Sequence, residues 1–135
     1  MSDIHKIGII GAGQMGSGIA QVCAGAGFDI VIMDASAPAL SKAHDLIGTR
    51  LEAMVGKGRI TKEERSASLT RITTSTEMTS LAECDLVIEA ASENEAIKRQ
   101  IYAKLCPVLK PEALIGTNTS SISITRLASS TDRPD

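Results

Sequence analysis

The sequence predicts an α/β domain built on a doubly wound parallel sheet. Short apolar runs alternate with helical segments along the chain, the first run ends in the glycine-rich turn GAGQMG (Gly11–Gly16), and an acidic residue closes the second run. Alternation of this kind is typical of a mostly parallel sheet with helices on both faces. The 135 residues suffice for one such domain and leave no room for a second.

The first three predicted elements form a β-α-β unit. Lys6–Ile10 is a continuous apolar run, as expected of a buried central strand. A helix follows, and Gly25 and Gly27 are placed to end it. Asp29–Met33 is the second strand, closed by Asp34. The apolar side chains that repeat along the helix are Met15, Ile19, Val22, Cys23 and Ala26.

Two helices are predicted where a simple crossover needs only one. The first begins at Ser36–Pro38 and continues until the glycines of Gly56–Gly58 interrupt it. Thr61 and Glu64 form a capping box for the second, which runs to about Leu69. This helix pair is an insertion between strands two and three.

The remaining elements continue the alternation. Ile72–Thr74 is a weak third strand and Asp85–Glu89 a strong fourth. A helix through Ala96–Leu105 follows, and two prolines stop it. Ala113–Gly116 is the fifth strand and leads to a short helix over about Ser123–Ala128.

Composition and charge argue against several partners. Phe28 and Tyr102 are the only aromatic residues, so the chain cannot stack nucleic-acid bases on a row of rings. A net charge of −2 provides no field that would attract a polyanion. No apolar stretch approaches the ~18 residues that a membrane span needs, and no signal peptide is visible. We therefore expect neither nucleic acid nor membrane as a partner.

The three cysteines are odd in number and widely spaced, at Cys23, Cys84 and Cys106. Such spacing suggests neither a disulfide framework nor a metal site. We expect reduced, buried thiols in a cytoplasmic protein without a bound metal.

The glycine-rich turn has the context of a dinucleotide site. A G-x-G-x-x-G pattern alone is weak evidence, but here a strand precedes it, a helix follows it, and Asp34 closes the next strand about 20 residues on. Gly11 allows the tight turn, Gly13 lets a pyrophosphate approach, and Gly16 lets the helix pack on the sheet. These features predict a Rossmann-type nucleotide-binding domain. A turn without any ligand is the alternative.

The residues beside this turn indicate which nucleotide it binds. The backbone amides at the helix start, including those of Gln14 and Met15, are expected to point at the phosphates. Asp34 is expected to accept hydrogen bonds from the adenosine ribose and to repel a 2′-phosphate, and no basic residue lies among the five that follow. NAD is therefore favoured over NADP. The alternative, Asp34 as a helix cap, is weakened because Ser36 can supply the cap.

Three motifs, taken in order, resemble the amino-terminal domain of the 3-hydroxyacyl-CoA dehydrogenase family, most closely its bacterial 3-hydroxybutyryl-CoA branch. They are GIIGAGQMGSGIAQ, DLVIEAASEN and TNTSSISI, and the resemblance covers essentially the whole chain. It implies an NAD-dependent oxidoreductase that converts the 3-hydroxyl of a short-chain 3-hydroxyacyl-CoA to a ketone. In such an enzyme the acyl-CoA substrate is the small-molecule partner.

The resemblance also implies roles for individual residues. The nucleotide turn of the family covers Gly11–Gly16, Ala12 included, and its ribose carboxylate falls on Asp34. Its serine that contacts the substrate falls on Ser120, the catalytic residue of this segment, and its coenzyme A contact on Lys57. Further cofactor contacts fall on Glu93, Lys98 and Asn118.

Each of these residues has a simpler interpretation. Glu93 can favour a helix start and Lys98 can be a solvated charge. Asn118 and Ser120 suit any loop after a strand, and Lys57 suits an exposed turn. Ser92 departs from the family pattern, because the family usually has a branched aliphatic residue at this position.

The chain lacks an evident general base. His5 precedes the first strand and His44 lies on the long helix, so neither is placed to reach a hydroxyl near Ser120. The resemblance implies that the catalytic His and its Glu follow residue 135, and that a helical domain with the dimer contacts comes after them. We expect an NAD-binding domain, residues 1–135, cut before its end. Alone it is expected to be inactive and monomeric, within a full-length homodimer.

Two other functions remain open on the sequence. One is a stand-alone nucleotide-binding or regulatory domain without catalysis. The other is a different dehydrogenase with the same turn, such as the 3-hydroxyisobutyrate or 6-phosphogluconate type. The helix pair and the TNTSS stretch argue against the second.

Overall fold

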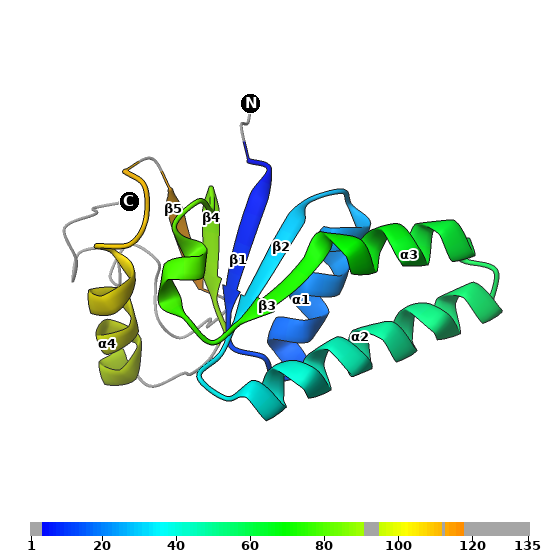
Figure 1. The fold of residues 1–135 in the computed structure, drawn as a ribbon, viewed down its shortest axis with the longest axis horizontal. Helices are drawn as coiled ribbons and strands as arrows, with labels where there is room; N and C mark the ends of the chain where they lie inside the picture. Colours follow the sequence, from blue (N-terminus) through cyan, green and yellow to red (C-terminus); the bar gives the residue numbers. More distant parts are fainter. Residues whose placement is uncertain (1–3, 91–94, 112, 118–135) are drawn as a thin grey trace.

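The computed structural model describes residues 4–90, 95–111 and 113–117 as one α/β unit (Figure 1). Its elements alternate as the sequence predicts. In chain order they are β1 (Lys6–Ile10), α1 (Gln14–Gly25), β2 (Asp29–Met33), α2 (Ala37–Gly56), α3 (Lys62–Arg71), β3 (Ile72–Ser75), the 3-10 helix η1 (Met78–Leu81), β4 (Leu86–Glu89), α4 (Glu95–Leu105) and β5 (Leu114–Thr117). The short helix expected near residue 125 lies outside the described residues.

The five strands form one parallel sheet in the order β3-β2-β1-β4-β5. The first strand is therefore central: Ile7 pairs with Ile30 of β2 on one side and with Leu86 of β4 on the other. Strand order reverses at this point, since β2 and β3 lie to one side of β1 and β4 and β5 to the other. In open α/β sheets, ligands bind outside the carboxyl ends of the strands at such a reversal.

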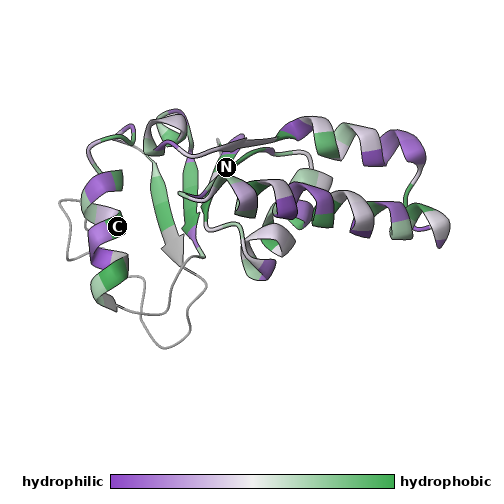
Figure 2. Cartoon of the chain, turned by 60° about the horizontal axis from the view of Figure 1, so that its bottom comes forward, coloured by the Kyte–Doolittle hydropathy of each residue, from purple (hydrophilic) through white to green (hydrophobic). Residues whose placement is uncertain are grey.

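Apolar side chains of the strands are covered on both faces. On one face Ile9 and Ile32 pack against α1 and α2, with Ile47 of α2 fully buried. On the other face Val31 and Val87 pack with residues of η1 and α4. Figure 2 shows green, apolar residues along the strands and many purple, polar residues along α2 and α3.

Helix α1 buries a different face from the one that its larger apolar residues suggest. The buried residues are small: Gly16, Ser17, Ala20 and Ala24. Met15 and Val22 are 57% and 72% exposed, so of the predicted stripe only Ile19 and Cys23 pack against the core. Small side chains occupy the packing face because they let the helix lie close to the sheet and to α2 and α3.

The helix pair is present, and its caps are as predicted. Ser36 Oγ accepts from the Ala39 N–H at 3.2 Å, and Thr61 and Glu64 form both bonds of a capping box. Helix α3 continues two residues beyond Leu69, so that Arg71 Nη1 donates to the Ala24 carbonyl at 2.7 Å. That bond ties α3 to the end of α1.

The link from β3 to β4 contains η1, which the sequence interpretation missed. A Cβ on Gly8 would lie 2.6 Å from Leu81 Cδ2 and 2.9 Å from Cys84 Sγ. Glycine at this position of β1 therefore lets the link lie flat on the sheet. Cys84 is buried as expected, whereas Cys23 and Cys106 are partly exposed, so the expectation of three buried thiols is wrong for two of them.

Asp85, predicted as the first residue of the fourth strand, lies just before β4 and ties the amino edge of the sheet. Its carboxylate accepts from the N–H groups of His5 and Lys6, at 2.8 and 3.0 Å, and from Lys110 Nζ. The Lys110 hydrogen bond is the main cause that holds the pKa of Asp85 well below its usual range, and the two backbone donors add to it. This cluster is at the end of the sheet opposite the glycine turn.

Candidate cofactor-binding site

The turn from β1 into α1 needs glycine at two positions for different reasons. Gly11 has φ 112°, a conformation that side chains disfavour. A Cβ on Gly16 would lie 1.9 Å from the Gly11 carbonyl oxygen. A Cβ on Gly13, in contrast, would meet nothing within 4 Å. The turn thus leaves open space beside Gly13 while Gly16 is tightly enclosed.

The start of α1 is suited to an anion. Gly13 is its N-cap and has no side chain to accept from the first amides, and no acidic residue lies in the first turn. The N–H groups of Gln14 and Met15 have no partner within the helix, because the first residues of a helix have no preceding turn. These amides and the helix dipole favour a negative group in front of Gly13.

Asp34 lies at the end of β2 and is hydrogen-bonded to the glycine turn. Its Oδ2 accepts from the Ala12 N–H and its Oδ1 from the Ser36 N–H, both at 2.9 Å. Ser36, not Asp34, is the N-cap of α2. Capping is therefore not the role of this carboxylate, and its position beside the turn agrees with that of a ribose ligand.

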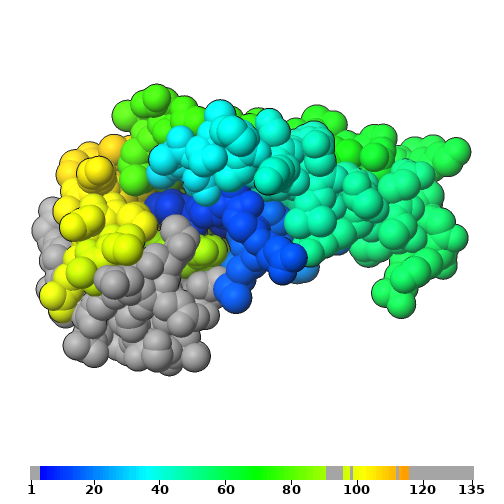
Figure 3. Space-filling view, turned by 90° about the horizontal axis from the view of Figure 1, so that it is seen from below, coloured from blue at the N-terminus to red at the C-terminus, as the bar shows by residue number. Residues whose placement is uncertain are grey.

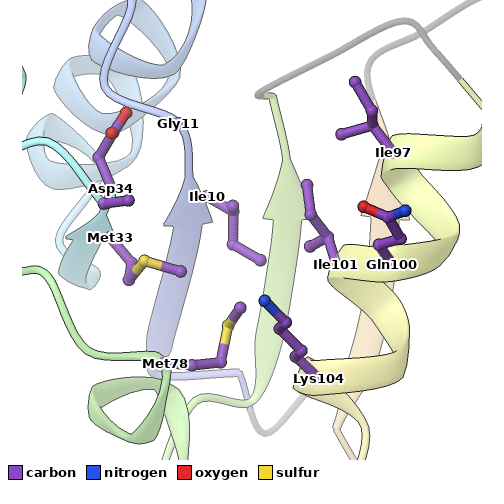
Figure 4. Close-up of a pocket in the computed structure, with 10 residues that line it drawn as sticks. Ile10, Gly11, Met33, Asp34, Met78, Ile97, Gln100, Ile101 and Lys104 are labelled. Carbon is purple, nitrogen blue, oxygen red and sulfur yellow. The ribbon is translucent and has the colours of Figure 1, made fainter.

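A pocket of about 290 Å³ opens beside Asp34, between the ends of β1 and β2 and the helix α4 (Figure 4). In the space-filling view from below, the blue glycine turn, the cyan start of α2 and the yellow α4 meet on one face (Figure 3). Most of the lining is apolar. The lining residues are Ile10, Gly11, Met33, Asp34, Ala35, Met78, Ile97, Gln100, Ile101 and Lys104.

The residues present fit a dinucleotide. The open space at Gly13 and the free amides suit a pyrophosphate, Asp34 suits a ribose diol, and the apolar pocket beside it suits a flat base. The fold and this site define a Rossmann-type dinucleotide-binding domain.

Comparison with known proteins gives the family. Residues 6–135 match the family described as "3-hydroxyacyl-CoA dehydrogenase, NAD binding domain". The chain belongs to this family, and its cofactor is NAD.

Individual relatives agree. A 3-hydroxybutyryl-CoA dehydrogenase of Bradyrhizobium diazoefficiens is 52% identical over 98% of this chain and 45% of its own length. The crystal structure of (S)-3-hydroxybutyryl-CoA dehydrogenase from Ralstonia eutropha has a TM-score of 0.94 at 39% identity, over 98% of this chain and 47% of that one. A 3-hydroxybutyryl-CoA dehydrogenase structure from Escherichia coli gives 0.95 at 42% identity, over 98% of this chain and 28% of that one. The chain thus spans less than half the length of these relatives.

The other predicted site residues are dispersed or lie outside the described residues. Lys57 is exposed and ends α2, at the far tip of the helix pair from the sheet (Figure 1). Lys98 belongs to α4, but its side chain is outside the described part. The remaining predicted positions also lie outside it, and they are Ser92, Glu93, Asn118 and Ser120.

Both histidines lie away from the carboxyl edge of the sheet. His5 precedes β1 and its backbone N–H is bonded to Asp85 at the opposite edge. His44 is exposed on α2 and lines a shallow recess against α3. Among the described residues, then, no histidine adjoins the candidate site.

Sequence reasoning missed the pocket wall contributed by α4. Ile97, Gln100, Ile101 and Lys104 share one side of the helix at spacings of three and four residues. The helix pattern therefore contained the signal for this wall.

Among the helices that the structure describes, none combines the length and the hydropathy that a membrane span requires.

Proposed function

We propose that this chain holds NAD across the carboxyl edge of its sheet, with the pyrophosphate at Gly13, the adenosine ribose at Asp34 and the adenine in the adjoining pocket. The hydrogen bond between Ala12 and Asp34 carries the proposal, because it fixes the carboxylate against the phosphate turn. The amides of Gln14 and Met15, with the rest of Gly11–Gly16, bind the phosphates.

Asp34 selects NAD over NADP. A carboxylate accepts from the ribose hydroxyls and repels a 2′-phosphate, which needs a nearby basic side chain instead. The five residues after Asp34 contain none, and the first basic one beyond them is the exposed Lys42. The electrostatic balance at this position therefore disfavours NADP.

The complete enzyme is proposed to oxidise a short-chain 3-hydroxyacyl-CoA to the 3-oxoacyl-CoA. The named relatives act on 3-hydroxybutyryl-CoA, and this chain corresponds to their NAD-binding part. NAD, when bound, accepts the hydride. In this proposal Ser120 hydrogen-bonds the substrate oxygen, and Lys57 contacts the coenzyme A. The cofactor contacts that complete the site are Glu93, Lys98 and Asn118.

The proton of the hydroxyl needs an acceptor that the described residues do not provide. Neither His5 nor His44 lies at the carboxyl edge, and a serine hydroxyl is too weak a base at neutral pH. The chain alone is therefore proposed to bind NAD without turning over substrate. We further propose that it is monomeric in dilute solution while the full-length enzyme is a homodimer, and that its three free thiols suit the reducing cytoplasm.

Titration calorimetry with NADH and NADPH tests the cofactor assignment. NADH is expected to bind much more tightly, and equal affinities would contradict the role of Asp34. NADH formation from NAD and 3-hydroxybutyryl-CoA, followed by absorbance, tests whether the chain alone turns over substrate. A positioned base contributes about 10²–10⁴-fold, so turnover by the chain alone is expected to be undetectable. Robust turnover would mean that His5, His44 or another residue of this chain is the base.

A further inference from the structure

The α4 wall of the pocket is partly polar. Ile97, Gln100, Ile101 and Lys104 follow one another along one side of the helix, and Figure 4 shows all four on the side that faces the strands. Lys104 reaches from α4 toward Met78. Apart from Asp34, the polar side chains that line this pocket within the described part of the chain are Gln100 and Lys104.

These two polar side chains are available to a ligand. No hydrogen bond or ion pair to another residue is found for either Gln100 or Lys104 in the part of the chain that the structure describes, and both side chains are exposed. The walls next to them are apolar, formed by Met33, Met78 and Ile101. A flat base that lies between such walls would present its polar edge to the amide and the ammonium group.

The two groups complement adenine. The edge of adenine carries an amino donor at N6 beside a ring acceptor at N1. An amide oxygen such as that of Gln100 can accept from the amino group, and an ammonium group such as that of Lys104 can only donate, as N1 requires. In hypoxanthine the hydrogen-bonding roles of these two positions are reversed: the oxygen on C6 accepts, and the N–H at N1 donates. The Gln100 amide can rotate to meet this reversal, but Lys104 cannot.

We propose that Gln100 and Lys104 read the polar edge of the adenine and make the pocket selective for NAD over its hypoxanthine counterpart. The inference rests on the proposed function, because it needs the adenosine of NAD to lie in this pocket. Asp34 recognises the ribose, and α4 recognises the base. Specificity thus comes from two elements on opposite walls of one pocket.

Titration of the chain with NADH and with deamino-NADH, in which hypoxanthine replaces adenine, tests the inference by affinity alone. NADH is expected to bind about tenfold more tightly or better, the discrimination that a matched polar pair gives. Gln100→Leu is expected to weaken both dinucleotides several-fold, because the amide can turn to serve either base. Lys104→Met is expected to lower the preference for NADH to near unity.

Lys42→Met is the control for Lys104→Met, because Lys42 is an exposed lysine of α2 outside the pocket. It is expected to change neither affinity, and thermal unfolding shows that each variant is folded. Equal binding of the two dinucleotides by the unmodified chain would overturn the inference while leaving the proposed function intact. So would equal weakening of both ligands by Lys104→Met. Failure of the unmodified chain to bind NADH would overturn both proposals.

Discussion

The Asp34 carboxylate accepts a 2.9 Å hydrogen bond from the N–H of Ala12, so the end of β2 holds the turn that follows β1. The other carboxylate oxygen accepts from Ser36. A carboxylate has about four lone-pair sites, so two remain for ribose hydroxyls. One side chain thus shapes the empty turn and keeps capacity for the ligand.

Asp34→Ala is expected to reduce stability as well as NADH preference. The Ala12 N–H is buried, and loss of its acceptor costs about 1–3 kcal/mol. Asp34→Asn keeps an acceptor and is expected to lose less stability. Both variants are expected to narrow the gap between NADH and NADPH affinity. Urea unfolding and calorimetry measure these effects, and an Asp34→Ala variant as stable as the parent would contradict the structural role.

Gly13→Ala and Gly16→Ala form a matched pair with opposite expected results. A methyl group on Gly13 points into open space, so the melting temperature of this variant is expected to lie within a few degrees of that of the parent. It is expected to lose NADH binding at least tenfold, because the methyl group occupies the pyrophosphate position. Gly16→Ala places a methyl group 1.9 Å from a backbone oxygen and is expected to unfold at a much lower temperature.

Circular dichroism melts and NADH titration separate the two glycine variants. Tight NADH binding by Gly13→Ala would show that the phosphates lie elsewhere. A Gly16→Ala variant of parental stability would mean that the turn can widen without cost.

Asp85→Asn is expected to destabilise the chain at neutral pH and to do so less as the pH falls. The folded state holds the pKa of Asp85 below its usual value of about 4, mainly through Lys110. The stabilisation is therefore complete above about pH 5 and is lost as the pH falls below about 4. The difference in melting temperature between parent and variant is expected to shrink over that range.

The control for Asp85→Asn is Asp45→Asn, since Asp45 is an exposed aspartate of α2. Its melting temperature is expected to follow that of the parent at each pH. A difference for Asp85→Asn that stays constant down to pH 3 would mean that the charge of Asp85 is not what stabilises the amino edge.

Cys84 is expected to be the least reactive of the three thiols. Burial raises the pKa of Cys84 to about 11, whereas Cys23 and Cys106 are partly exposed. Iodoacetamide at pH 8 followed by mass spectrometry is expected to label Cys84 last. Because the unfolded thiol ionises near pH 9, this group's contribution to stability is present below pH 9 and is lost as the pH rises toward 11. Early labelling of Cys84 in folded protein would contradict its burial.

The strands and helix caps could be predicted because local chemistry determines them. The apolar run at Lys6–Ile10 and the capping box at Thr61 and Glu64 are as expected. The glycine turn and its acidic partner could be placed together for the same reason, since both follow buried strands whose carboxyl ends meet at one edge. The family match confirms NAD as the cofactor.

Tertiary packing decided what the sequence pattern could not. The spacing of Met15 and Val22 predicted an apolar stripe on α1, but the close approach of the helix to its neighbours selected Ala20 and Ala24 instead. The hydrogen bond from the Ala12 N–H to Asp34 joins residues that follow two different strands, and no local pattern signals it. The roles of Glu93, Lys98, Asn118, Ser120 and Lys57 remain predictions.

The central place of β1 also fixes the order in which the sheet can be assembled on the ribosome. β1 can pair with β2 once Met33 has emerged, but its other edge must wait for Leu86–Glu89. At about 5–20 residues per second this interval lasts roughly 3–11 s. During those seconds the nascent chain carries an unpaired strand edge, the kind of surface that templates misassembly and that chaperones shield. β1 is thus enclosed on both edges later than β2, whose second partner is β3, although β1 is made before it.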